Sequence, residues 1–366
     1  MTSIALVHDW LPGMRGGERA LEVLCERYPS AELFTLVHVR GSVSPAIERL
    51  PIHTSFVQRL PLAKRRYREY LPLFPIAIEQ LDVDDFDLVI SLSHCCAKAI
   101  VRPGRAMHLC YCLTPMRYAW DQFDAYFGRD RIGRVGNLVM RRTMARLARW
   151  DRDTADRVDR YVAISHYVAS RIRRYYNREA TVVYPPVDTV FFHPDASPPE
   201  RHALVVSALV PYKRIEVAID ACRLAKVPLH IVGEGPDRPR LEAGARDGVQ
   251  FLGRLSDSDV REAYRRAAVI LLPGEEDFGI VPLEAQACGR PVVALARGGA
   301  LETVVPGETG ELVEEASAKA FADAIRRTVD RRFDVSVIQQ HADKFSRQRF
   351  GDEIELIVND LVKATW

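Results

Sequence analysis

Short, continuous runs of apolar residues recur along the whole chain and alternate with segments of helical pattern. Apolar and polar residues do not alternate within them, so they predict strands buried on both faces, as in parallel sheets. Because helix-like segments follow most of the runs, the repetition predicts doubly wound α/β domains. The runs are residues 4–9, 33–37, 87–91, 107–112, 160–165 and 181–186 in the first half, and 203–209, 228–233, 249–253, 269–273 and 291–295 in the second.

Length and composition narrow the class of protein. A chain of 366 residues is long for one core and predicts two domains at about 150 residues each. The proline-rich stretch at residues 184–200 is the natural linker, so we place one domain at 1–188 and the other at 189–348. No apolar run is long enough for a membrane span, and residues 1–10 do not resemble a signal peptide. The seven scattered cysteines are expected to be packing thiols in a reducing cytoplasm.

The charge is divided unevenly along the chain. Residues 1–190 hold 28 Lys and Arg against 21 Asp and Glu, a balance of +7, whereas the remainder holds 23 against 28, a balance of −5. A basic first half indicates a surface that meets anions. The arginines are spread along helices without an aromatic-rich binding motif, so we do not expect nucleic acid as the partner.

Glycines, charged residues and helix starts gather directly after the predicted strands. Gly16 and Gly17 follow the first strand, His94 the third and residues 114–121 the fourth, and similar loops follow the strands of the second half. Ligands of open α/β sheets bind outside the carboxyl ends of the strands. The pattern therefore predicts two Rossmann-like domains whose sheets face each other across a ligand cleft.

The segment at residues 275–293 carries two glutamates, Glu276 and Glu284, among small and apolar residues. It follows a predicted strand and opens a helix near Gly279, where the backbone N–H groups of Phe278, Gly279 and Ile280 suit a phosphate. The two carboxylates would bracket that phosphate and accept hydrogen bonds from hydroxyl groups. The alternative is one helix-capping acid and one surface acid.

Other residues at strand ends have two interpretations each. Lys213 and Arg214 are predicted to open a helix, where paired cations suit a diphosphate or form a solvated helix surface. Gly16 and Gly17 let the backbone approach a ligand or make a tight turn, and they do not form a dinucleotide fingerprint. His94 is either a site residue or a structural histidine.

Two Asp-x-Asp pairs have the form of metal ligands. Asp82 and Asp84 precede a predicted strand and so lie at the wrong edge of the sheet, whereas Asp257 and Asp259 fit the first turn of a helix, where the helix dipole favours acids. We therefore expect no metal site and no cofactor.

Taken together, these segments resemble the retaining glycosyltransferases of family 4, which have the GT-B fold. Residues 275–294 are similar to the E-x7-E segment of that family, and the resemblance covers nearly the whole chain. The other matching segments are "GGE" (16–18), "GEGP" (233–236), "FLGRLSD" (251–257) and "RGGALETVVPGETGELV" (297–313), in the family's order. The segments "VHDWL", "TPMRYAWD", "YPPVDT" and "SALVPYKRI" resemble bacterial mannosyltransferases of O-antigen and exopolysaccharide assembly.

The resemblance implies a role for each matching residue. The second domain would bind the nucleotide sugar, most simply GDP-mannose, and the first the acceptor, a glycan or a polyprenyl-diphosphate-linked oligosaccharide. Residues 349–366 would form a helix that returns to the first domain. The implied catalytic residues are Glu276, Lys213 and His94. The implied nucleotide-sugar-binding residues are Gly16, Gly17, Lys213, Arg214, Gly233, Arg254, Leu255, Phe278, Gly279, Ile280 and Glu284, and the acceptor-side residues are Arg117, Tyr118, Trp120 and Asp121.

The implied roles within the donor site are specific. Glu284 would hold the ribose, Arg254 and Leu255 would contact the base through their backbone, Lys213 would bind the diphosphate and Glu276 would orient the sugar. The family often has Gly-Arg-Leu where residues 207–209 are Ser-Ala-Leu. One phosphate-binding arginine is thus missing, and we expect Arg214 to replace it.

Three alternatives remain open at the level of sequence. The donor could be a UDP-sugar or another GDP-sugar, the enzyme could be a sugar-nucleotide 2-epimerase, or the chain could bind a sugar nucleotide without catalysis. The basic segments 58–74 and 129–149 predict peripheral attachment to the anionic inner face of the plasma membrane, with a solvated helix surface as the equal alternative.

Overall fold

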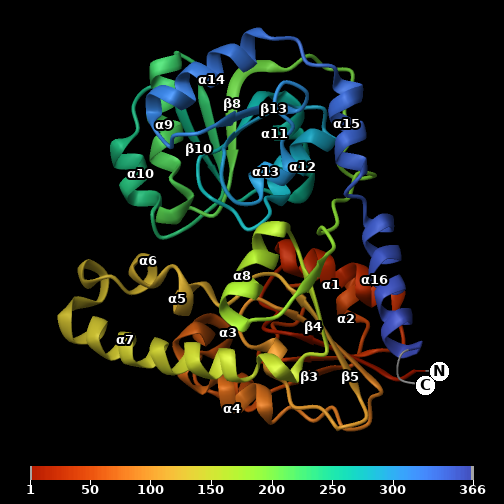
Figure 1. The fold of residues 1–366 in the computed structure, drawn as a ribbon. Coiled ribbons are helices and arrows are strands. Elements are labelled where there is room, and N and C mark those ends of the chain that lie inside the picture. Colours follow the sequence, from red (N-terminus) through yellow and green to blue (C-terminus); the bar gives the residue numbers. More distant parts are fainter. Residues whose placement is uncertain (1, 364–366) are drawn as a thin grey trace. The chain divides into compact units, whose positions relative to one another are not determined.

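The computed structural model describes residues 2–363, except for the side chains of residues 125, 126 and 129–132. The chain divides into two compact units (Figure 1). The first consists of Met1–Pro186 together with Phe350–Trp366, and the second of Val187–Arg349. The division falls within the proline-rich stretch at residues 184–200. Residues 364–366 of the expected C-terminal helix lie outside the described residues.

The first unit is built on a parallel sheet, with seven strands among residues 2–363 in the order β3-β2-β1-β4-β5-β6-β7. β1 pairs with β2 on one side and with β4 on the other. Strands β2 and β3 are therefore added on one side of β1 and the later strands on the other, so the strand order reverses between β1 and β4; we call this place the reversal point. The strands are β1 (Ile4–His8), β2 (Glu32–Thr35), β3 (Ile52–Thr54), β4 (Leu88–Ser93), β5 (Met107–Cys112), β6 (Arg160–Ala163) and β7 (Ala180–Val182).

Helices lie on both faces of this sheet (Figure 1). Ala5 and Val7 of β1 point into a core shared with Phe74 and Leu147, which come from helices on one face. On β5, the ring of Tyr111 packs edge-on against Phe350, with ring centroids 5.3 Å apart. The helices are α1 (Gly16–Arg27), α2 (Pro45–Glu48), α3 (Ala63–Arg66), α4 (Phe74–Glu79), α5 (Arg117–Trp120), α6 (Phe123–Phe127), α7 (Arg129–Asp153) and α8 (His166–Tyr176).

The second unit repeats this plan with six parallel strands in the described range, ordered β10-β9-β8-β11-β12-β13. Here progression reverses between β8 and β11, which pair directly. The strands are β8 (Glu200–Val206), β9 (Leu229–Val232), β10 (Val249–Gly253), β11 (Ala267–Leu272), β12 (Val292–Leu295) and β13 (Gly310–Val313). The helices are α9 (Ile215–Ala225), α10 (Arg238–Gly244), α11 (Asp257–Arg266), α12 (Ile280–Ala287), α13 (Ala300–Thr303), α14 (Ala318–Asp330) and α15 (Val335–Asp343).

The last helix, α16 (Arg347–Lys363), crosses the division and packs on the first unit from Phe350 onward. Its Asp352 and Glu355 form ion pairs with Arg27 at the end of α1, the second at 2.7 Å. Together with the contact between Phe350 and Tyr111, these pairs attach the end of the chain to the first unit.

The prediction of two Rossmann-like domains with parallel sheets is confirmed. The apolar runs missed two short edge strands, β3 and β13, because they are only three and four residues long and contain polar residues, so they give no continuous apolar pattern. All seven cysteines are free and buried, as expected for packing thiols. Within residues 2–363, no helix combines the length and apolar character needed for a membrane span.

Candidate active site

Lys213 and Glu276 meet where the two central strands of the second sheet end. β8 runs into a 3₁₀ turn, η5 (Pro211–Lys213), whose last residue is Lys213. β11 ends at Leu272, and Glu276 follows in the next loop. Because these strands are neighbours at the reversal point, the two side chains come together as an ion pair, each about one-sixth exposed (16% and 15%). The structure thus joins two of the predicted catalytic residues.

The loops around this pair pack backbone against backbone. A side chain on Gly233, after β9, would come within 1.9 Å of the carbonyl oxygen of Ser207, after β8. A Cβ on Gly299 would lie 2.2 Å from Cα of Phe278, and the N–H of Gly299 donates to the carbonyl oxygen of Glu276 at 2.8 Å. Only glycine permits such close approach, so the close packing of these loops explains the two glycines.

Glu284 lies in α12, half-buried beside the loop that carries Glu276. Its carboxylate accepts a 2.9 Å hydrogen bond from the hydroxyl of Tyr264, a fully buried residue of α11. Burial, followed by the charge of Glu284, raises the pKa of Tyr264 well above its usual value, so the phenol stays a hydrogen-bond donor. Tyr264 has no local sequence signal, since a tyrosine in an amphipathic helix is usually a core residue.

Two of the helices that lack a side-chain N-cap, α1 and α12, begin after central strands. The helices α8, α11 and α14 are capped by the side chains of Ser165, Ser256 and Ser317. By contrast, no side chain caps α1 after Arg15 or α12 after Gly279. Uncapped N–H groups at a helix N-terminus suit an anion, and both helices begin at the carboxyl edge of a central strand.

Helix α9 begins at Ile215, directly after the predicted pair Lys213 and Arg214, and Arg214 is its N-cap residue. The turn itself differs from a regular helix start, because Lys213 ends a 3₁₀ turn that begins at Pro211 and Arg214 adopts a left-handed conformation (φ 53°). Its side chain is exposed. Farther along the same edge, Arg254 is exposed and Leu255 is half-buried, and Leu255 packs against the core.

In the first unit, Asp9 follows β1 and is fully buried at the corresponding reversal point. Its Oδ2 accepts from the backbone N–H groups of His94 (2.7 Å) and Cys95 (2.9 Å), and its Oδ1 from those of Cys96 (2.6 Å) and Ala97 (2.8 Å). The carboxylate therefore fixes the whole turn after β4. Asp9 was not among the predicted site residues, although an acid at the end of the first apolar run was a readable signal.

The His94 ring is held by two neighbours. Its Nδ1 lies 2.9 Å from Oδ2 of Asp9, at an angle that departs from a regular hydrogen bond, so the contact is mainly electrostatic. Its ring meets Trp10 edge-on, with centroids 4.5 Å apart. Burial would raise the pKa of Asp9, but the charge of His94 and the hydrogen bond from the backbone N–H of His94 act against burial, and the pKa of Asp9 is lowered.

Gly17 of α1 lies near the same cluster. A Cβ on Gly17 would stand 2.6 Å from Cδ1 of Leu113 and 3.5 Å from Nε2 of His8, whereas one on Gly16 would meet nothing within 4 Å. His8 is fully buried, and its Nε2 has no hydrogen-bond partner. Burial lowers the pKa of His8. The structure thus brings Gly17 to the cluster around His94 and leaves space at Gly16.

The predicted acceptor-side residues have separate surroundings. The Tyr118 hydroxyl donates to Sγ of Cys95, next to His94. Trp120 donates from Nε1 to Asp151 at 2.8 Å, and Asp121 accepts from Arg171 and Tyr175 of α8. These contacts anchor the loop 114–122, and Arg117 lies half-exposed in it.

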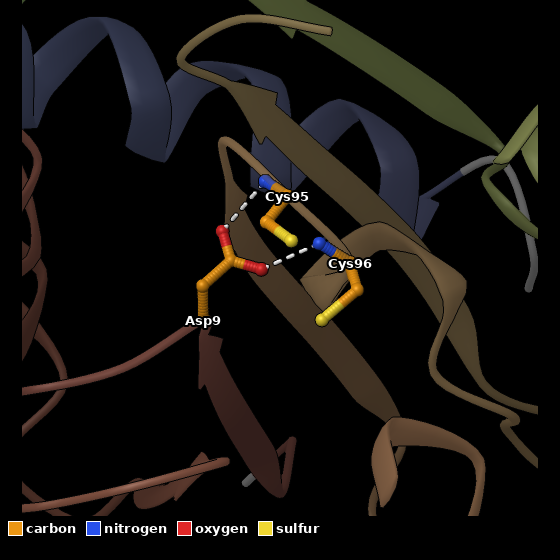
Figure 2. Close-up of side chains that lie close together, drawn as sticks. All are labelled: Asp9, Cys95 and Cys96. Atoms are coloured by element: carbon orange, nitrogen blue, oxygen red, sulfur yellow. Dashed lines mark hydrogen bonds between the residues drawn. The ribbon is translucent and has the colours of Figure 1, made fainter. Parts of the chain in front are cut away.

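Asp9, Cys95 and Cys96 bring three potential metal ligands within 4.8 Å of one another (Figure 2). Both oxygens of Asp9 already accept backbone hydrogen bonds, two of which Figure 2 shows. Burial raises the pKa of both thiols, which disfavours the thiolate that a metal needs. The group fits a structural turn better than a metal centre.

A hollow of about 420 Å³ lies at the opposite edge of the second sheet. It is lined by residues before β9 and β10 and at the end of α9, among them Asp220, Arg223, Lys226 and Asp247. It contains none of the predicted site residues and faces the amino ends of the strands, so it is not the candidate site.

The whole chain shares its fold with GT-B glycosyltransferases. HepE of Anabaena in complex with UDP is 17% identical, with a TM-score of 0.71 over 98% of this chain and 100% of that chain. Sucrose-phosphate synthase of Thermosynechococcus elongatus is 20% identical, with a TM-score of 0.72 over the full length of both. At identities of 17% and 20%, this structural similarity shows a common fold alone.

The second unit is similar in sequence to known glycosyltransferases. Residues 188–348 match the family described as glycosyl transferases group 1. D-inositol 3-phosphate glycosyltransferase of Geodermatophilus obscurus is 33% identical over 231 residues, 54% of this chain and 51% of the relative. The chain spans about half the length of the curated relatives it matches.

Proposed function

We propose that the chain is a retaining glycosyltransferase that moves a hexose, in the first place mannose from GDP-mannose, onto a glycan or lipid-linked acceptor in surface polysaccharide biosynthesis. The observation that carries this proposal is the pairing of Lys213 with Glu276 at the reversal point of the second sheet. It lies within the segment that matches group 1 glycosyltransferases and on the edge of the sheet where α/β ligands bind.

Each part of a nucleotide sugar has a matching group in the second unit. The N-terminus of α12, uncapped by a side chain, and Lys213 suit the diphosphate, and Glu284 suits the ribose. The backbone at Arg254 and Leu255 suits the base. Glu276 suits the hydroxyl groups of the sugar, because both oxygens of an ionised carboxylate accept hydrogen bonds.

The chemistry requires stabilisation of a leaving diphosphate. As the glycosidic bond breaks, negative charge grows on the phosphate oxygen, and preorganised cations and N–H groups stabilise it most effectively. Lys213 supplies the cation and α12 the N–H groups. A donor phosphate oxygen then takes the proton of the attacking acceptor hydroxyl on the same face of the sugar, which retains the anomeric configuration. This scheme needs no metal, so activity should persist in excess EDTA.

The nucleotide base is the finer part of the proposal. The segments around residues 7–11 and 207–215 resemble mannosyltransferases, which supports GDP-mannose. HepE has been solved with UDP and with UDP-glucose, which supports a UDP-sugar as the second candidate. Titrating GDP, UDP, GDP-mannose and UDP-glucose into the protein decides between them.

In this proposal, the first unit binds the acceptor and contacts the membrane. On α7, Val135 (79% exposed), Leu138 (52%) and Val139 (55%) stand outside the core, among exposed arginines such as Arg134 and Arg142. Apolar and basic side chains on one helix suit an anionic lipid surface. In the segment 58–74, by contrast, Tyr67 and Leu71 belong to the core, so α7 is the stronger candidate.

An epimerase is the rival enzyme class, and labelled donor distinguishes the two. Protein incubated with a radiolabelled sugar nucleotide and a lipid-linked acceptor should transfer the label to the acceptor. Conversion of the donor to its 2-epimer without acceptor would instead identify an epimerase. Binding of the donor with neither reaction would identify a sugar-nucleotide binder.

A further inference from the structure

The contact between Asp9 and His94 determines more than the shape of a turn. His94 keeps 27% of its side chain exposed while Asp9 is fully buried. The carboxylate faces one ring nitrogen, Nδ1, at 2.9 Å, and the edge-on contact with Trp10 restricts rotation of the ring. A neutral imidazole carries its proton on only one nitrogen, and a carboxylate partner at Nδ1 selects which one.

We propose that Asp9 is a positioning residue that keeps the proton of His94 on Nδ1, so that Nε2 presents a lone pair to a hydroxyl group of the sugar substrate. The proposal rests on the glycosyltransferase function proposed above. In this arrangement His94 accepts a hydrogen bond from the sugar, and Asp9 acts only through His94. Without the carboxylate, the two tautomers would compete and the ring would lose its orientation.

A metal-binding role and a purely structural role for Asp9 both account for fewer of its contacts. Four backbone N–H groups donate to the carboxylate, and a metal site here would also need the thiolates of Cys95 and Cys96, which burial disfavours by raising the pKa of both thiols. A purely structural role accounts for those four bonds, but it leaves the fifth contact, with the ring of His94, without a reason. The structural and positioning roles differ in what they predict for the protons of His94.

The direct test is ¹⁵N NMR of the intact protein with labelled histidine at pH 8. The chain has ten histidines, and His94→Gln identifies the signals of His94 by their loss. His108 is an internal reference, because its Nδ1 lies 3.1 Å from the carbonyl oxygen of Arg157 and must donate there. We expect His94 to show a protonated Nδ1 and a bare Nε2, as His108 does. A protonated Nε2, in the other tautomer or in an imidazolium, overturns the proposal.

A double-mutant cycle supplies the functional test. We expect Asp9→Asn to lower kcat on the order of tenfold in the wild-type background and less than twofold in the His94→Ala background, because coupled residues are not additive. An equal loss in both backgrounds would make Asp9 merely structural. If Asp9→Asn does not fold, the NMR measurement on the wild-type protein still shows which nitrogen of His94 carries the proton and so tests the proposal.

The experiments distinguish an error in the glycosyltransferase function from an error in the positioning role of Asp9. If no nucleotide sugar binds to the wild-type protein, the glycosyltransferase function is wrong. If donor binds and is turned over but Nε2 of His94 is protonated, only the positioning role of Asp9 is wrong.

Discussion

Lys213 and Glu276 form an ion pair where β8 and β11 end side by side. The lysine that we assign to the diphosphate is thus already neutralised by the glutamate that we assign to the sugar. A diphosphate must compete with Glu276 for Lys213, and this competition makes the two assignments separable by binding measurements.

The first prediction concerns Glu276. Glu276→Gln removes the competing charge, so we expect the affinity for the nucleoside diphosphate product to stay equal or rise, while turnover falls at least about a hundredfold. A hydrogen bond to a charged group contributes roughly 1.5–3 kcal/mol, which sets the upper size of the gain in affinity. Calorimetry with GDP and UDP checks the first part and initial rates the second. Weaker diphosphate binding in Glu276→Gln would show that the pair does not compete with the ligand.

The second prediction concerns Glu284. Glu284→Gln keeps a hydrogen-bond acceptor for Tyr264 but lacks the charge that holds a ribose diol, so we expect about a tenfold loss in donor affinity with little change in kcat. Tyr264→Phe is the matched control, because it removes the partner hydroxyl and leaves the carboxylate in place. Equal losses in the two variants would assign Glu284 to the fold rather than to the ribose.

The third prediction concerns Arg214, the proposed replacement for the missing phosphate-binding arginine. Arg214→Gly removes the cation at a left-handed position that glycine adopts readily, and we expect kcat/KM to fall at least about tenfold. Lys226→Gly is a close control, since Lys226 is an exposed cation at the other end of α9 with φ 58° against 53° for Arg214. Activity of Arg214→Gly within twofold of Lys226→Gly would show that Arg214 is surface charge.

The fourth prediction concerns the pH dependence of stability. His108 is fully buried between Ser91 Oγ (2.8 Å) and the carbonyl oxygen of Arg157, and burial lowers its pKa to about 3. The unfolded chain binds a proton below about pH 6.5 and the folded chain does not, so stability is complete above that pH and falls as the pH drops from 6.5 toward 3. Between pH 7 and pH 5 the loss amounts to about 2 kcal/mol.

Tryptophan fluorescence measures this effect in the first unit, because Trp10, Trp120 and Trp150 all lie there. Urea unfolding at pH 7 and pH 5 should show the loss in the wild-type protein and a smaller one in His108→Gln, which does not titrate. An identical pH dependence in both proteins would exclude His108 as the source.

The fifth prediction concerns the membrane. We expect binding to anionic vesicles to be salt-sensitive and to weaken at least tenfold in Arg142→Glu/Arg146→Glu, since each basic residue near an anionic surface contributes about 1 kcal/mol. Arg326→Glu/Arg327→Glu, on α14 of the second unit, is the charge-matched control. Equal partitioning of the wild-type protein onto neutral and anionic vesicles would contradict the assignment of α7.

The sequence allowed the fold and the loops of the second unit to be predicted, because buried parallel strands leave continuous apolar runs and ligand loops follow them. It did not predict Tyr264 as the partner of Glu284, since that contact joins two helices through tertiary packing. Asp9 was missed for a similar reason: its partners at residues 94–97 are distant in sequence and become neighbours only when β1 pairs with β4. The left-handed Arg214 was missed because non-glycine residues seldom adopt that conformation.

Donor binding by the wild-type protein, Lys213→Met and Lys226→Met tests the central claim most directly. GDP, UDP and their sugar derivatives should be titrated into each protein with calorimetry and thermal unfolding as readouts. We predict that one nucleotide family binds the wild-type protein and stabilises it by about 2.7 kcal/mol at 100 times its Kd. Lys213→Met should lose at least about tenfold in affinity, and Lys226→Met should match the wild type. Binding of no nucleotide to the wild-type protein, or equal binding by all three proteins, would contradict the account.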